Sequence, residues 1–163
     1  MKVLGIDPGY AIVGWGVVEI DGTTSSDYNG ITLIECGVIR TDSKLTLPER
    51  LNEIFTDINQ IFGEFNPDLV GIETLLFQTN VKTAMAVSEA RGVIMLAAHQ
   101  ANLTVQPVTP SQVKSSIAGY GKADKKQVQE SVRLLCGLAE VPKPDDAADA
   151  VAIAIAANSL YRM

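Results

Sequence analysis

The stretch KVLGIDPG, residues 2–9, opens the chain with an apolar run that ends at an acid and a turn signal. A second apolar run, residues 68–72, leads in the same way to Glu73. Strands that helices cover on both faces are buried, so a carboxylate at the end of one is costly unless a cation compensates its charge. Asp7 and Glu73 are therefore candidate site residues, although a simple turn at Asp7 and an ordinary loop acid at Glu73 stay open as alternatives.

The pattern of the remaining sequence predicts an α/β fold. Runs rich in Val and Ile predict strands, and apolar residues that repeat at three and four predict helices, the first of them behind a capping box of Thr46 and Glu49. We expect strands over residues 3–6, 12–20, 32–40, 68–72 and 103–108, and later helices over about 80–100, 109–118, 125–138 and 146–160. The order βββαβαβααα predicts a single domain over residues 1–163, with a five-stranded mixed sheet and helices on both faces.

Composition narrows the class of protein. The chain has 163 residues, 47% of them apolar and 20% charged, which suits one packed core and excludes a disordered chain. No run approaches the roughly 20 apolar residues of a membrane span, and an acid comes too early for a signal or transit peptide. Cys36 and Cys136 lie in apolar runs and indicate buried thiols of a reducing compartment. We therefore expect a cytoplasmic protein without a membrane partner.

The charge balance does not decide whether the chain binds nucleic acid. Lys and Arg number 13 against 19 Asp and Glu, for a net charge of −6, whereas proteins that hold a phosphate backbone usually show a basic face. The distribution of charge matters more than its sum, however. Four lysines gather within a short stretch of the sequence, namely Lys114, Lys122, Lys125 and Lys126.

The last expected helix carries the acids that are hardest to explain as surface charge. Asp146 and Asp149 lie three residues apart on one face of a helix that is otherwise almost entirely Ala, Val and Ile. Asp145 and Asp146 could serve as an N-cap and a first-turn acid, but Asp149 has no capping role. If the strand ends meet the start of this helix, the carboxylates form a cluster that favours Mg²⁺ or Mn²⁺. Two such ions about 4 Å apart suit phosphodiester hydrolysis.

Four motifs in this order resemble those of the RuvC family of bacterial Holliday-junction resolvases. They are GIDPG at residues 5–9, IE at 72–73, EARG at 89–92 and DAADA at 146–150. The likeness runs from about residue 2 to residue 158 and implies an RNase H-like fold. Sugar-kinase and actin-like ATPases also begin with a strand and an Asp-Gly turn, but such an ATPase would need a longer chain and a second phosphate loop.

The resemblance implies a set of site residues. The family's four metal-binding catalytic carboxylates fall on Asp7, Glu73, Asp146 and Asp149, which would hold two Mg²⁺ ions, with Mn²⁺ able to substitute. Its basic catalytic residues near the cleaved phosphate match Lys114 and Lys125, which could also be ordinary solvated lysines. Lys122 and Lys126 are expected to contact the DNA backbone.

The chain departs from the family pattern after the catalytic glutamate. The aromatic residue expected to wedge into the junction is replaced by Leu76, and Phe77 follows it. Phe77 is therefore the candidate DNA-binding wedge, or else a core residue of the next helix. Thr79 stands where a basic residue is frequent.

Family membership implies a Mg²⁺-dependent endodeoxyribonuclease of DNA recombination and repair. Such an enzyme works as a homodimer and resolves four-way junctions by paired symmetric nicks, together with a branch-migration motor complex. The helix over residues 80–100 would supply the dimer face, where Ala84, Met85, Ser88 and Gly92 are small or adaptable. Two alternatives stay open: another nuclease on this fold, such as an RNA–DNA hybrid hydrolase or a phage resolvase, and a junction-binding module without activity.

Overall fold

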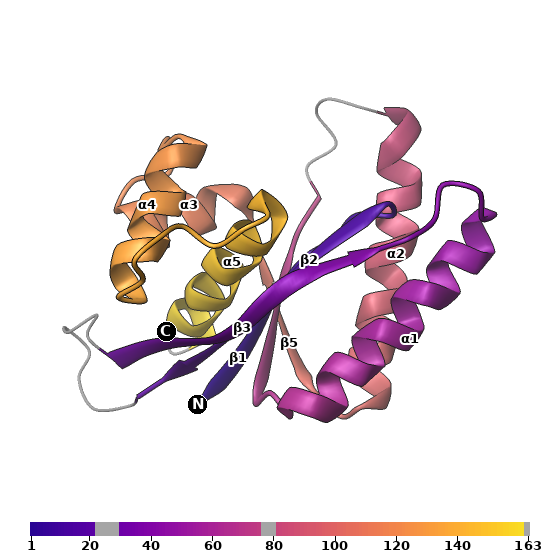
Figure 1. Ribbon diagram of the computed structural model, residues 1–163, viewed down its shortest axis with the longest axis horizontal. Coiled ribbons are helices and arrows are strands. Elements are labelled where there is room, and N and C mark those ends of the chain that lie inside the picture. The colour runs from indigo at the N-terminus through magenta and orange to yellow at the C-terminus, as the bar shows by residue number, and fades with distance from the viewer. Residues whose placement is uncertain (22–29, 76–80, 162–163) are drawn as a thin grey trace.

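A five-stranded mixed sheet organises the computed structural model of the chain, which describes residues 1–21, 30–75 and 81–161 (Figure 1). The strands are β1 (Lys2–Asp7), β2 (Ile12–Ile20), β3 (Ile31–Arg40), β4 (Leu69–Glu73) and β5 (Thr104–Val108), in the spatial order β3-β2-β1-β4-β5. β1 pairs antiparallel with β2 and parallel with β4, while β2–β3 is antiparallel and β4–β5 parallel. The predicted mixed sheet and order of elements are confirmed.

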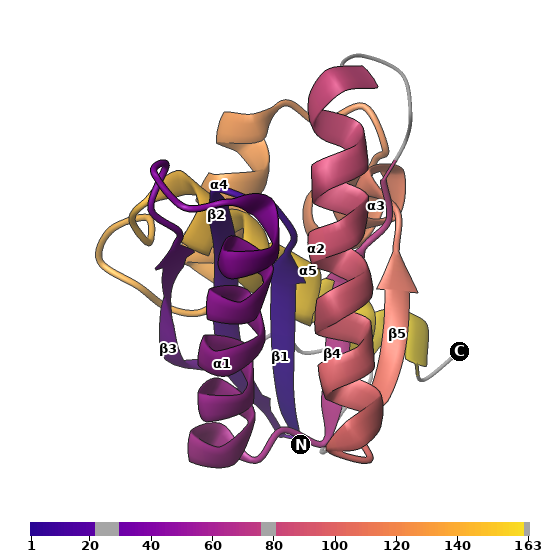
Figure 2. The same ribbon diagram turned by 90° about the vertical axis from the view of Figure 1, so that its right-hand side faces the viewer.

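In the part of the chain that the structure describes, five helices cover the two faces of this sheet (Figure 2). They are α1 (Leu47–Phe65), α2 (Val81–Gln100), α3 (Pro110–Ala118), α4 (Lys125–Leu135) and α5 (Asp145–Tyr161). α1 and α2 pack on one face, and α5 packs on the other, where α3 and α4 contact it. No helix in the described ranges combines the length and apolar character that crossing a membrane requires.

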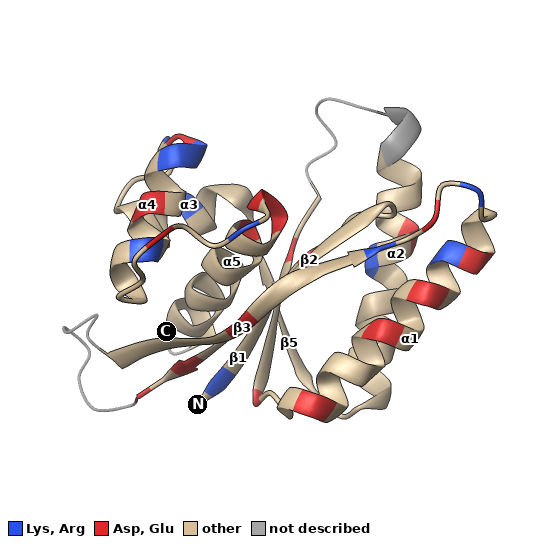
Figure 3. Cartoon of the chain, in the orientation of Figure 1, with Lys and Arg blue, Asp and Glu red and all other residues tan. Residues whose placement is uncertain are grey.

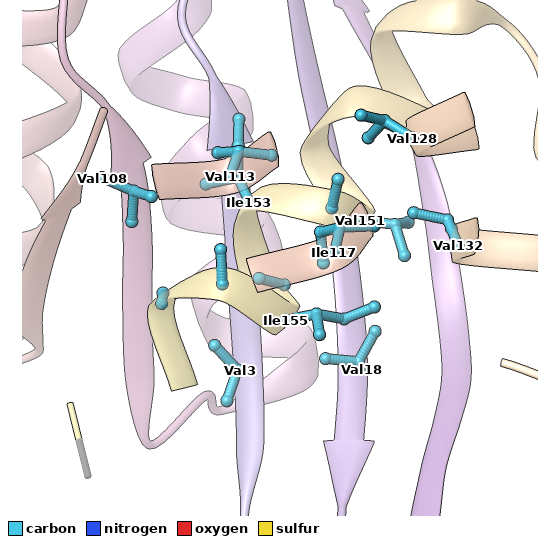
Figure 4. Packing of buried hydrophobic residues seen from close by; sticks show 14 of the residues in the cluster. Val3, Val18, Val108, Val113, Ile117, Val128, Val132, Val151, Ile153 and Ile155 are labelled. Carbon is cyan, nitrogen blue, oxygen red and sulfur yellow. The ribbon is translucent and has the colours of Figure 1, made fainter. Parts of the chain in front are cut away.

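Side chains on β1 and β4 alternate between two hydrophobic cores, as the period of a strand dictates. Val3 and Leu69 belong to the core around α5, whereas Leu4 and Val70 belong to the core beneath α1 and α2. Figure 4 shows the first of these cores, in which Val3 and Val18 of the sheet lie near valines and isoleucines of α3, α4 and α5. The alternation sends the side chains of Val3 and Asp7 toward α5, and between them Gly5 presents its backbone to the same helix.

Glycines allow α5 to lie directly on the sheet. A Cβ atom added to Gly5 would lie 2.0 Å from the Ala150 carbonyl oxygen, and one added to Gly14 would lie 2.1 Å from the Asp146 carbonyl oxygen. A glycine inside a strand commonly marks such a close approach. The helix matches this surface because alanines make up much of it, and residues 147–148 and 150–158 are all buried. The sheet glycines that meet α5 are Gly5, Gly14, Gly16 and Gly71.

Two helix ends differ from the prediction. α4 ends at Leu135 rather than at residue 138, because Gly137 takes a left-handed conformation with φ of 62° and ends the helix. α5 begins at Asp145, so this residue is not the N-cap. The Pro144 carbonyl accepts hydrogen bonds from the Ala147 and Ala148 N–H groups instead. Pro144 therefore occupies the position that precedes the helix.

The cysteines are free, as expected, but neither is fully buried. Cys36 lies on β3, at the edge of the sheet, and Cys136 follows the last residue of α4. Both side chains pack against the core around α5 and remain partly exposed. The expectation of buried thiols was therefore wrong in degree, because an edge strand and a helix end are each covered on one side only.

Changing Gly5 to alanine tests the contact between α5 and β1. Because the added Cβ would meet the helix backbone, Gly5→Ala should destabilise the protein by about 3 kcal/mol or more. Gly63→Ala is the matched control, since an added Cβ there meets nothing within 4 Å and alanine favours the α1 helix by up to about 1 kcal/mol. Urea unfolding followed by circular dichroism measures both. Equal stability of Gly5→Ala and the unchanged protein would contradict the close approach.

Candidate active site

Asp7 and Glu73 end two neighbouring parallel strands. Ile6 of β1 is in register with Ile72 of β4, so the next residue on each strand lies beside the other. Asp7 lies two residues after Gly5, and Glu73 lies two residues after Gly71; both glycines face α5. Because side chains two residues apart on a strand point to the same face, both carboxylates also point to the α5 face of the sheet. The structure therefore brings together the two acids that the apolar runs singled out.

The first turns of α5 add the remaining acids. The Asp146 backbone lies over Gly14, which is the cross-strand partner of Asp7 on β2. Asp149, one turn further along, lines a cavity with Asp7 and Glu73. The close seating of α5 on the glycines thus places the helix acids above the strand ends.

A cavity of about 210 Å³ lies at this meeting point. Carboxylates come to it from β1, β4 and α5, and lysines come from α3 and α4. Apolar side chains of the three helices complete the wall. The lining residues are Asp7, Glu73, Pro110, Val113, Lys114, Lys125, Val128, Asp149, Ala152 and Ile153. Asp146 does not line the cavity, although its charge acts on two of the acids that do.

Burial and mutual repulsion make the strand-end carboxylates reluctant to ionise. Burial raises the pKa of Asp7 to about 7, and the charges of Glu73, Asp149 and Asp146 add to this, while Lys125 opposes it. Burial also raises the pKa of Glu73 to about 7, with a further contribution from Asp149 and a partial offset by Lys114. Perturbed acids of this kind in a cavity are typical of functional sites.

Lys125 forms an ion pair with Asp149 that the sequence did not indicate. Its Nζ atom lies 2.9 Å from Asp149 Oδ2 and 3.5 Å from Asp145 Oδ2. The pair only partly offsets the burial of Asp149, whose pKa remains raised. No periodicity links a residue at the start of α4 to one in α5, so this contact follows only from the packing of the two helices.

Arg91 is a second residue whose role the sequence left unassigned. It belongs to the EARG motif and reaches the end of β4 from α2, on the opposite face of the sheet. Its Nε atom donates a hydrogen bond to the Glu73 carbonyl oxygen, 3.0 Å away. On the other side, the Thr74 N–H donates to the Val108 carbonyl of β5 at 2.8 Å. The backbone that carries the Glu73 carboxylate is therefore held from two directions.

The donor set fits a hard divalent cation. The acids offer only carboxylate oxygens, which Mg²⁺ and Mn²⁺ prefer, and a bound cation would offset the burial and the mutual repulsion that raise the pKa values of Asp7 and Glu73. Within the described residues, however, no three Asp, Glu, His or Cys side chains converge closely enough to hold an ion in the arrangement seen. Asp149 is instead paired with Lys125, whose Nζ atom lies 2.9 Å from Asp149 Oδ2.

The other predicted site residues lie apart from the cavity or outside the described chain. Lys122 and Lys126 are exposed, and Lys126 borders a separate shallow hollow with Tyr120 and Glu130. Asp145 lies at the exposed start of α5. The candidate wedge Phe77, together with Leu76 and Thr79, falls outside the described residues.

Comparison with known proteins gives one consistent result. The family model described as "Crossover junction endodeoxyribonuclease RuvC" matches residues 3–157. A Thermosipho melanesiensis protein of the same description is 50% identical over 154 residues, which make up 94% of each chain. The solved structure of Thermus thermophilus RuvC is similar with a TM-score of 0.91 and 34% identity, covering 100% of this chain and 96% of that one. A complex of T. thermophilus RuvC with a Holliday junction substrate gives a TM-score of 0.87 and 32% identity over the same shares.

The chain is thus an α/β protein of the RNase H-like class, with carboxylates gathered where strand ends meet the last helix. It belongs to the RuvC family, because the match covers most of its length at high identity. The resemblance seen in the sequence and the fold that it implied are both confirmed.

The raised pKa of Asp7 predicts how stability depends on pH without added metal. In the unfolded chain Asp7 has its ordinary pKa of 3.8, whereas in the folded protein its pKa is raised to about 7. Between these values the unfolded state loses a proton that the folded state keeps. Asp7 therefore destabilises the fold increasingly as the pH rises, and the effect is complete above pH 7.

Asp7→Asn removes this effect because the amide does not ionise. In chelator at pH 8 the variant should be more stable than the unchanged protein, on the order of 2 kcal/mol, with little difference at pH 4. Urea unfolding at both pH values measures the change, and Asp57→Asn, an exposed acid on α1, serves as control. Equal or lower stability of Asp7→Asn at pH 8 would contradict the buried, repelled carboxylate.

Proposed function

We propose that this chain is a metal-dependent endodeoxyribonuclease that resolves four-way Holliday junctions by paired symmetric nicks, in DNA recombination and repair. The observation that carries the proposal is the cavity in which carboxylates of two parallel strand ends and of α5 face lysines of α3 and α4. Membership of the RuvC family supports the reaction type. The structure with a Holliday junction substrate, for a protein 32% identical to this chain, supports the substrate.

Asp7, Glu73, Asp146 and Asp149 would hold two Mg²⁺ ions, for which Mn²⁺ could substitute. When bound, such ions activate water and stabilise the oxygen that leaves the phosphorus atom. The carboxylates would hold the ions, and the hydrogen bond from the Arg91 side chain to the Glu73 carbonyl keeps the Glu73 backbone in place. The family resemblance and the all-oxygen donor set support this assignment.

Lys114 and Lys125 would act on the cleaved phosphate. They approach the cavity from α3 and α4, opposite the strand-end carboxylates. A cation there stabilises the negative charge that develops on phosphate oxygens in the transition state. Val113 and Val128 line the same wall of the cavity beside them.

The distribution of charge is compatible with DNA despite the net charge of −6. Figure 3 shows Lys and Arg on α3 and α4, next to the acidic start of α5, whereas α1 carries mainly acids. DNA would therefore approach across α3, α4 and the start of α5. Lys122 and Lys126 are exposed, apart from the cavity, and would contact the phosphate backbone.

Paired nicks require two active sites, so we propose that the chain works as a homodimer. α2 offers a surface for this, since Met85 is 68% exposed, Leu96 is 51% exposed, and Gly92 leaves open space around it. The role of Phe77 as a wedge, the branch-migration motor complex and the cytoplasmic location remain predictions from the sequence.

The carboxylates are tested on a mobile four-way junction with Mg²⁺, read as paired symmetric nicks on a denaturing gel. Asp7→Asn, Glu73→Gln, Asp146→Asn and Asp149→Asn should each lower cleavage by at least about a hundredfold while junction binding is kept, because each removes one charged ligand. Asp145→Asn is the matched control on α5 and should remain nearly normal. Flap and RNA–DNA hybrid substrates in parallel test the alternative nuclease activities.

Two results would contradict this proposal. Full cleavage in EDTA would exclude a metal-dependent reaction. Loss of cleavage in Asp145→Asn together with normal cleavage in Asp146→Asn would show that the wrong face of α5 had been assigned to the site.

The roles of the four lysines are distinguished by comparing the rate of cleavage with the affinity for DNA. Lys114→Ala and Lys125→Ala should lower the single-turnover rate at saturating protein by about tenfold to a hundredfold, since they face the cavity. Lys122→Ala and Lys126→Ala should mainly weaken binding and reduce the salt slope by about one unit each. Binding titrations at several salt concentrations complete the comparison. Unchanged saturated rates in both Lys114→Ala and Lys125→Ala would make them ordinary surface lysines.

A further inference from the structure

The side chain of Lys125 crosses from α4 to the acids of α5. Its Nζ atom lies 2.9 Å from Asp149 Oδ2, within charge-assisted hydrogen-bond distance, and 3.5 Å from Asp145 Oδ2. The hydrogen bond to Asp149 is the main reason that the pKa of Lys125 is raised. The same charge lowers the pKa values of Asp7 and Asp149 against the effect of burial. Lys125 thus reaches from α4 and partly neutralises the acids of the cavity.

The ion pair engages a carboxylate that the proposed function assigns to metal. An oxygen that accepts a hydrogen bond from an ammonium group is less available to a divalent cation, and an ammonium beside the cation repels it. Two divalent cations would balance four carboxylates without help from a lysine. Metal binding and the Lys125–Asp149 pair are therefore alternatives.

The start of α4 allows the side chain to move while the backbone stays fixed. Asp124 caps the helix by accepting a hydrogen bond from the Gln127 N–H at 2.9 Å, and the Gln127 side chain accepts from the Asp124 N–H at the same distance. The Tyr120 hydroxyl donates to Gln127 at 2.7 Å. The Lys125 side chain itself is 53% exposed, so its flexible stem can turn into solvent at little cost.

We propose that Lys125 is an exchangeable internal counter-ion, which holds Asp149 in the metal-free protein and is released when divalent cations bind the carboxylates. This inference rests on the proposed function, because it takes Asp149 as a metal ligand. The released ammonium group becomes available to a DNA phosphate at the mouth of the cavity. Loading with metal would therefore make the site more receptive to its substrate.

Binding of Mn²⁺ to the DNA-free protein tests the exchange without reference to cleavage. Lys125→Met removes the competing charge and keeps most of the length of the unbranched side chain. The variant should bind Mn²⁺ about three- to tenfold more tightly than the unchanged protein, as judged by electron paramagnetic resonance of free Mn²⁺. Lys126→Met is the matched control, since Lys126 lies in a separate hollow, and it should change the affinity by less than about twofold.

Labelling of the unchanged protein gives a second measurement that needs no variant to fold. Lysine amines are acetylated with a limiting reagent, with and without Mg²⁺, and the sites are quantified by mass spectrometry. Mg²⁺ should increase labelling of Lys125 at least about twofold by freeing its amine, relative to Lys126 as internal control. The same experiment on Asp149→Asn should give high Lys125 labelling without metal.

The outcomes separate this inference from the proposed function. Weaker or equal Mn²⁺ binding by Lys125→Met, or Lys125 labelling that Mg²⁺ does not change, would overturn the exchange even if the protein cuts junctions. Tighter binding and increased labelling in a protein that fails to cut junctions would support the exchange and refute the proposed function. Absence of Mn²⁺ binding in all forms would overturn both.

Discussion

The close contact between α5 and the glycines of the sheet is the constraint on which the rest of this structure depends. Strand glycines at Gly5, Gly14, Gly16 and Gly71 remove the side chains that normally separate a helix from a sheet, and alanines do the same from the helix side. This contact buries little apolar surface, because the residues that form it are small. Its main effect is to fix the position of α5 close to the sheet. The helix acids arrive beside the strand-end acids as a result.

Bringing acids together in this way works against the stability of the isolated protein. Burial and repulsion raise the pKa values of Asp7 and Glu73 to about 7, so the site favours neutral carboxyls or bound cations. Lys125 and Lys114 offset part of the repulsion. The repulsion between these acids lowers the stability of the fold, as is common at functional sites where like charges lie close together.

The sequence was sufficient to predict features that depend on local periodicity. Asp7 and Glu73 stood out because apolar runs led to them, and Asp149 because its helix was otherwise apolar. Contacts that depend on how elements pack were not predictable: Lys125 meets Asp149 only through the seating of α4 on α5, and Arg91 meets Glu73 through the sheet. Two features of the sequence could have improved the prediction. The strand glycines indicate a close approach of a helix, and Gly137 indicates the early end of α4.

The seating of α5 also has a consequence for synthesis of the protein. Asp7 of β1 and the acids of α5 lie far apart in the sequence, and no contact local in sequence can join them. A chain still growing on the ribosome, or cut before residue 145, presents a bare glycine face and half a set of carboxylates. Under the proposed function, such a fragment would lack two of the four carboxylates, so the site would form only after α5 has packed onto the sheet.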